Sequence, residues 1–109
     1  MDLENKIKVG IRGISGLLGM RLALAIQKQP DMALTAGIAR NDESLKRIVD
    51  GSHNFWPRPI YLDEPHIAVR ELSILYPNFY FEPADQLNFS KTCDVVVDTA
   101  SPGSRQKWD

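Results

Sequence analysis

The feature that most constrains the fold of this chain is a set of three evenly spaced glycines, Gly13, Gly16 and Gly19. A short apolar run precedes them, and an amphipathic segment follows them at once. Strand, glycine-rich turn and helix, in this order, are what a dinucleotide-binding βα unit requires. The pattern therefore predicts a strand over residues 6–12 and a helix over residues 16–29.

Each glycine has a physical role at its position. Gly13 lacks a Cβ and so permits the strand to turn sharply into the helix. Gly16 leaves room for a pyrophosphate to approach the backbone, and Gly19 lets helix and strand pack closely. Because the first N–H groups of a helix attract anions, the N–H groups near Ser15 to Leu18 are expected to point at the phosphates. The alternative is a glycine turn in an ordinary βα unit that binds no ligand.

The remaining apolar pattern predicts a parallel α/β sheet. Residues 33–39 are small and apolar, which suits a strand covered on both faces, and three valines within 93–99 indicate a buried central strand. Further elements are expected as strands at 59–62 and 79–81, helices at 43–50 and 64–75, and a helical turn within 83–90. The residues of the first helix expected to face the sheet are Leu18, Leu22, Ala25 and Ile26. The predicted fold class is a Rossmann-type, doubly wound parallel sheet of four to five strands.

Length and composition set the frame for this fold. A chain of 109 residues predicts one domain, and a complete dinucleotide domain has about six strands, so 1–109 is expected to be such a domain truncated before a catalytic domain. The net charge of −1 favours neither nucleic acid nor an anionic membrane, and no apolar run approaches the ~20 residues that span a bilayer. The single cysteine, Cys93, fits a reducing compartment, and the acidic N-terminus does not resemble a signal peptide. These features predict a cytoplasmic protein.

The turn after the second expected strand bears on the choice of cofactor. NAD-binding domains place an acidic residue there to bind the ribose hydroxyls, whereas this chain reads Ala39-Arg40-Asn41. The guanidinium of Arg40 has the charge and geometry to hold a 2′-phosphate, which favours NADP and leaves NAD or dual use open. Asn41 or Asp42 can cap the next helix. The alternative is that Arg40 is a solvated surface charge.

A second loop is expected to complete the site. Thr99, Ala100 and Ser101 follow the valine strand, and ligands of open α/β sheets bind beyond the carboxyl ends of the strands. The loop should therefore lie beside the glycine turn, near the nicotinamide ribose, unless it is an ordinary β-turn. Neither Cys93 nor the two histidines have partners at catalytic or metal-ligand spacing, so no catalytic or metal-binding residue is expected in this chain.

Three segments, residues 7–23, 31–41 and 92–103, resemble the amino-terminal domain of type II (archaeal-type) glyceraldehyde-3-phosphate dehydrogenase. The resemblance implies hydride transfer between nicotinamide and a thioester-bound acyl group in the intact protein. For the cofactor, it implies a pyrophosphate at the glycine turn, bound by Gly13, Ile14, Ser15, Gly16, Leu17 and Leu18. It also implies that the other cofactor contacts come from Arg40, Asn41, Thr99, Ala100 and Ser101. The family's catalytic cysteine lies in an S-C-N-T-type segment that these 109 residues lack, so the chain by itself is not expected to be active.

Other interpretations remain open. The G-x-x-G-x-x-G spacing is also similar to that of dihydrodipicolinate reductase and of N-acetyl-gamma-glutamyl-phosphate reductase, both of which bind NAD(P). A stand-alone, non-catalytic nucleotide-binding or interaction module is a third interpretation. In each case an exposed sheet edge beside the valine strand invites pairing with another chain, which predicts a homo-oligomer.

Overall fold

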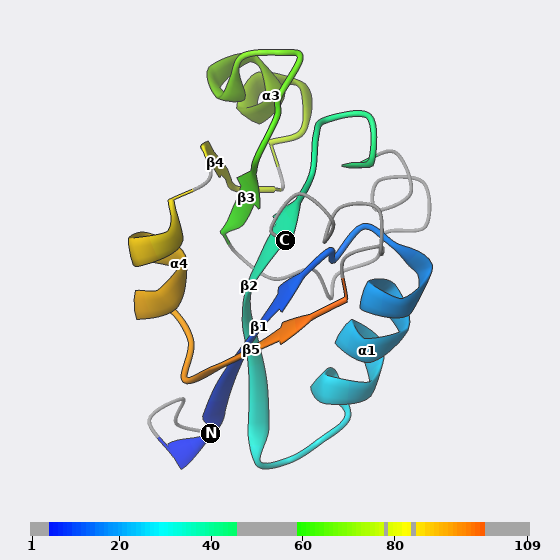
Figure 1. Ribbon diagram of the computed structural model, residues 1–109, viewed down its shortest axis with the longest axis vertical. Helices are drawn as coiled ribbons and strands as arrows, with labels where there is room; N and C mark the ends of the chain where they lie inside the picture. The colour runs from blue at the N-terminus through cyan, green and yellow to red at the C-terminus, as the bar shows by residue number, and fades with distance from the viewer. Residues whose placement is uncertain (1–4, 46–58, 78, 84, 100–109) are drawn as a thin grey trace, which may run out of the picture.

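The computed structural model describes residues 5–45, 59–77, 79–83 and 85–99. They form one parallel sheet of five strands in the order β4-β3-β2-β1-β5, with helices between the strands (Figure 1). The elements in chain order are β1 (Ile7–Arg12), α1 (Leu17–Gln27), β2 (Met32–Ala39), β3 (Ile60–Leu62), α3 (Val69–Leu75), β4 (Phe81–Pro83), α4 (Gln86–Lys91) and β5 (Val95–Asp98). The predicted α/β class and strand number are confirmed.

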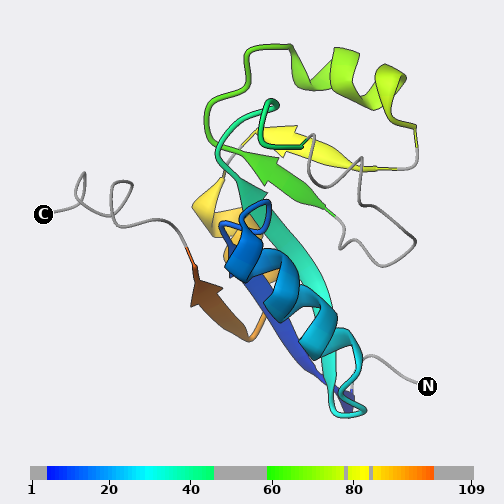
Figure 2. The same cartoon turned by 90° about the vertical axis from the view of Figure 1, so that its right-hand side faces the viewer.

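The sheet changes winding direction at β1. The strands β2, β3 and β4 extend the sheet to one side of β1, whereas β5 returns to pair with its other side. Right-handed crossovers then require helices on both faces, and α1 and α4 do lie on opposite faces (Figures 1 and 2). The gap between the carboxyl ends of β1 and β5 is therefore the point at which open α/β sheets bind ligands.

The sheet separates two apolar layers. The layer on the α1 face is formed by Val9, Ile11, Ile14, Ala23, Ile26, Ala39, Leu45, Ile60, Leu62, Leu72 and Phe81. The layer on the α4 face is smaller and consists of Ala36, Ile38, Tyr61 and Phe89. A Cβ on Gly10 would lie 2.8 Å from both the Phe89 ring and the Cys93 sulfur, so the missing side chain in β1 lets α4 dock.

The buried face of α1 agrees with the expected one only in part. Ile26 is buried and Leu22 packs against the core, as expected, but Leu18 is 64% exposed and Ala25 is also exposed. Gly19 and Ala23 are buried in their place, and the helix packs closely on the glycine turn at Gly19. Because successive helical residues are rotated by about 100°, a face centred on 19, 23 and 26 turns positions 18 and 25 toward solvent.

The start of α3 was predicted wrongly. The helix begins at Val69 rather than Glu64, because the preceding segment is held against the turn after β2. The Glu64 amide donates to the Arg40 carbonyl over 2.6 Å, and the His66 amide donates to the Asp42 carboxylate over 2.7 Å. These bonds fix the segment in a non-helical path across that turn.

The other short elements lie close to their expected places. The strand expected at 79–81 is shifted to Phe81–Pro83, and α4 (Gln86–Lys91) confirms a helical turn in this region. Of the helix expected at 43–50, residues 46–50 lie outside the described residues.

The position of β5 corrects another expectation. Within the described residues β5 lies at the edge of the sheet and pairs with β1 alone. Val95 and Val96 are 48% and 44% exposed, so this strand is not buried on both faces. An apolar run indicates that other side chains cover the strand, but it does not show whether those side chains belong to the same chain.

Candidate functional site

The turns that follow four parallel strands meet at the carboxyl edge of the sheet. They are the glycine turn after β1, the Arg40 turn after β2, the segment 63–64 after β3, and Thr99 after β5. Three of the four carry residues expected from the sequence to bind a cofactor. The contacts among these turns define the candidate site.

The backbone of the glycine turn is closed by hydrogen bonds to β2 and within itself. Gly13 has φ of 83°, a conformation that side chains disfavour, and this confirms its role in the sharp turn. The amides of Gly13 and Ile14 both donate to the Ile38 carbonyl, over 2.9 and 3.1 Å, and the Gly16 amide donates to the Gly13 carbonyl over 3.1 Å. The turn is thus anchored to the neighbouring strand.

Close packing under the turn depends on Gly19. A Cβ at this position would overlap the Gly13 carbonyl oxygen and lie 2.9 Å from the Ile14 Cα, which confirms the close helix–strand contact. Ile14 itself is fully buried and fills the space above Gly37, where a Cβ would meet its side chain at 2.6 Å. The Ile14 side chain therefore serves the core, and only its backbone borders the site.

The amino end of α1 has N–H groups that the helix itself does not use. Gly16 is the N-cap, and no side chain caps the helix there. The Met20 amide donates to the Gly16 carbonyl over 2.9 Å, so the amides of Leu17 and Leu18 precede the first helical bond. Their side chains are 67% and 64% exposed, whereas Ser15 is 7% exposed and places a hydroxyl in the turn.

Thr99 ties the end of β5 to the glycine turn. Its hydroxyl donates to the Arg12 carbonyl over 2.8 Å and lies 3.2 Å from the Gly13 carbonyl, and its amide donates to Arg12 over 2.9 Å. The expected proximity of this loop to the glycine turn is confirmed at Thr99. Ala100 and Ser101 lie outside the described residues.

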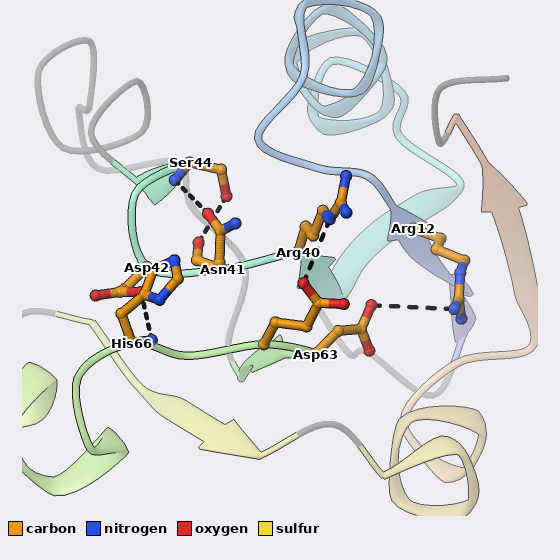
Figure 3. Close-up of polar contacts among 8 residues, drawn as sticks. Arg12, Arg40, Asn41, Asp42, Ser44, Asp63 and His66 are labelled. Atoms are coloured by element: carbon orange, nitrogen blue, oxygen red, sulfur yellow. Dashed lines mark hydrogen bonds and ion pairs between the residues drawn. The ribbon is translucent and has the colours of Figure 1, made fainter. Parts of the chain in front are cut away.

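The turn after β2 contributes to an exposed ion pair and contains a local side-chain hydrogen bond (Figure 3). The Arg40 Nε lies 3.5 Å from the Glu64 Oε2. The Asn41 side chain accepts from the Ser44 amide over 3.0 Å, and the Ser44 hydroxyl donates to the Asn41 carbonyl over 2.7 Å. The helix that Asn41 or Asp42 was expected to cap lies mostly outside the described residues, and the Asp42 carboxylate accepts from the His66 amide.

Sequence reasoning missed the acidic pair that follows β3. The Asp63 carboxylate lies 4.0 Å from the Arg12 guanidinium, and Glu64 pairs with Arg40, so each of the two adjacent acids faces an arginine (Figure 3). The available signal was the position of both acids directly after the apolar run 59–62. That position puts them at the carboxyl end of the third expected strand.

Cys93 lies at the amino end of β5, away from this edge. Its thiol donates to the Phe89 carbonyl over 3.0 Å, and burial raises the pKa of the thiol, so the reactive thiolate is disfavoured. The Cys93 thiol is thus a partly buried group that packs against α4. Within the described ranges no group of three or more His, Cys, Asp or Glu side chains is placed to hold a metal ion.

An open groove of about 540 Å³ lies on the α4 side of the sheet. It is lined by Pro59, Tyr61, Tyr80, Glu82, Asn88, Lys91 and Thr92. The Tyr80 hydroxyl donates to the Glu82 carboxylate over 2.6 Å, and this bond raises the pKa of Tyr80. Pro59 and Tyr80 precede β3 and β4, so this groove is separate from the carboxyl edge.

No protein-family model, curated protein or solved structure matches this chain. In the part of the chain that the structure describes, no helix combines the length and apolar character needed to cross a membrane. The function is therefore argued from the geometry of the carboxyl edge.

Proposed function

We propose that this chain binds a nicotinamide dinucleotide at the carboxyl edge of its sheet, as the cofactor domain of an oxidoreductase of the glyceraldehyde-3-phosphate dehydrogenase type. The observation that carries the proposal is the uncapped amino end of α1, directly after the Gly13 turn and beside the switch between β1 and β5. Amides at such a helix end favour a phosphate anion. The pyrophosphate would lie against Gly16, where the missing Cβ leaves the backbone accessible.

The other turns support the same orientation of the cofactor. Arg40 follows β2, where the adenosine ribose of a bound dinucleotide lies, and its exposed guanidinium suits the 2′-phosphate of NADP. Thr99 lies across the glycine turn, on the side proposed for the nicotinamide ribose. The cofactor would supply hydride transfer with an aldehyde or acyl-phosphate substrate, while these residues bind and orient it.

In this proposal the nucleophile and general base lie outside the 109 residues. The pKa of the Cys93 thiol is raised and the group is remote from the carboxyl edge, so it does not suit the part of a nucleophile. The proposal includes a reducing, cytoplasmic compartment, in which this single cysteine stays a thiol.

A related reductase is the second candidate. The G-x-x-G-x-x-G spacing, with Gly19 packed on the Gly13 carbonyl, favours a cofactor domain like that of dihydrodipicolinate reductase or an acyl-phosphate reductase. Both enzyme candidates require the same cofactor site. They differ in catalytic groups that this chain does not contain.

A non-catalytic interaction module is a candidate from a different class, and the edge strand favours it. Within the described residues β5 pairs with β1 alone, and Val95 and Val96 are nearly half exposed. Such an edge favours pairing with a second copy of the chain. We expect light scattering to show a dimer or larger assembly at millimolar concentration, and a monodisperse monomer would contradict this part of the proposal.

Isothermal titration with NADP and NAD tests the cofactor site. The sharpest variant is Gly16→Ala, because its Cβ makes only an ordinary 3.4 Å contact with the Gly13 carbonyl but occupies the space proposed for the pyrophosphate. We expect this variant to stay folded and to lose affinity for both nucleotides by about tenfold or more. Ala25→Val, on an exposed position of the same helix, is the control. Absence of binding by a folded wild-type chain would reject the cofactor role.

A further inference from the structure

The backbone places Glu64 beside Arg40. β2 and β3 pair in parallel up to Ala39 and Leu62, and the pairing continues past the strand ends. The Asp63 amide donates to the Ala39 carbonyl over 3.1 Å, and the Glu64 amide donates to the Arg40 carbonyl over 2.6 Å. The two charged side chains are therefore neighbours because main-chain bonds hold their residues together.

The side chains of this pair are accessible to a ligand. The Arg40 and Glu64 side chains are 55% and 54% exposed, and their closest charged atoms are 3.5 Å apart. An exposed ion pair contributes little free energy, so an incoming anion or hydroxyl can separate it. The neighbouring pair of Arg12 and Asp63 is less exposed, at 19% and 33%, and borders the same edge (Figure 3).

We infer that Glu64 is a specificity-determining residue that opposes the 2′-phosphate of NADP. The inference rests on the proposed dinucleotide site. A carboxylate accepts hydrogen bonds from the ribose hydroxyls of NAD, whereas it repels a phosphate bound by the adjacent Arg40. The acidic residue that most NAD sites carry after β2 is here supplied after β3. Arg40 alone favours NADP, but Glu64 counters this preference, and the wild-type chain discriminates little between the two cofactors.

The test compares dissociation constants for NADP and NAD in the full chain. Glu64→Gln keeps the shape of the side chain but removes the charge, so we expect the preference for NADP over NAD to rise by about tenfold. Asp31→Asn is the matched control, because Asp31 is exposed and precedes β2 at the opposite end of the sheet. This variant should leave the preference unchanged. Adding Arg40→Gln to Glu64→Gln should abolish the gain, because the phosphate then lacks its cation.

The outcomes separate this inference from the proposed function. If wild type and Glu64→Gln bind both nucleotides with the same preference, the role of Glu64 is rejected and the dinucleotide site stands. An equal gain in Asp31→Asn would also reject it, because net charge would then explain the change. If none of the folded proteins binds either nucleotide, the proposed function is rejected, and this inference with it.

Discussion

The turn after β1 and the turn after β2 lie at the same edge of the sheet, but different forces hold them. The first is built from backbone: Gly13 in a left-handed conformation, amides bonded to Ile38, and Gly19 packed on a carbonyl. The second is built from the Asn41 side chain, which accepts from the Ser44 amide, and from an exposed ion pair between Arg40 and Glu64. The steric requirements at Gly13 and Gly19 tolerate almost no substitution. Exposed charges such as those of Arg40 and Glu64 can be replaced with little change in the free energy of unfolding.

This difference separates the roles that the two turns would have. A rigid, anchored turn suits the pyrophosphate, which every nicotinamide dinucleotide shares. An adaptable charged turn suits the adenosine ribose, at which NAD and NADP differ. The predictions below test whether stability and selectivity divide between the two turns in this way.

The largest effect is expected from Gly19→Ala. The new Cβ would meet backbone atoms of Gly13 and Ile14, so helix and strand must separate, and the free energy of unfolding should fall by about 2–3 kcal/mol. Urea denaturation measures this loss. Gly16→Ala, with its ordinary contact, is the control and should lose less than about 1 kcal/mol. Equal losses in the two variants would contradict the packing role of Gly19.

A smaller effect is expected from Thr99→Val, which removes the hydroxyl bonded to the Arg12 carbonyl over 2.8 Å. The amide of residue 99 keeps its own bond to Arg12, so unfolding should become easier by about 1 kcal/mol. Thr35→Val is the control, because the Thr35 hydroxyl lies 3.4 Å from its acceptor, too far for a strong bond. If both variants unfold alike in urea, Thr99 does not tie β5 to the turn.

The smallest effect on stability is expected from Arg40→Gln. The pair with Glu64 is exposed, and main-chain bonds hold this turn without it, so the free energy of unfolding should change by about 0.5 kcal/mol or less. Affinity for NADP should nevertheless fall by about tenfold, with affinity for NAD retained. A loss of stability as large as that of Gly19→Ala would remove the contrast between the two turns.

The sequence predicted the features whose physical requirement is local. A positive φ and a close contact of the helix with the turn each depend on one residue type at one position, and Gly13 and Gly19 were correctly assigned. The parallel sheet followed in the same way from apolar segments that alternate with helical ones. Strand boundaries near β1 and β2 were close for the same reason.

Features that depend on distant partners could not be predicted in this way. Helical spacing alone placed Leu18 against the sheet, but the contact at Gly19 rotates that face away. Pro65 is compatible with the first turn of a helix that begins at Glu64. Because the His66 amide donates to the Asp42 carboxylate, however, α3 begins only at Val69. The packing of Gly19 on the glycine turn determined the first outcome, and a bond between residues 24 positions apart determined the second.

By itself, the sequence determined that this chain forms a parallel α/β sheet with a glycine turn after its first strand. Backbone sterics and apolar periodicity depend on the type of residue at each position, and both can be read from neighbouring residues. Only the tertiary structure decided that the valine strand β5 lies at an edge and that Glu64 stands beside Arg40. Strand order and the pairing of strand ends bring together residues whose separation in the sequence carries no signal. Arg40, which suggested NADP, was visible in the sequence. Only the pairing of β3 with β2 showed that the Glu64 carboxylate lies beside it.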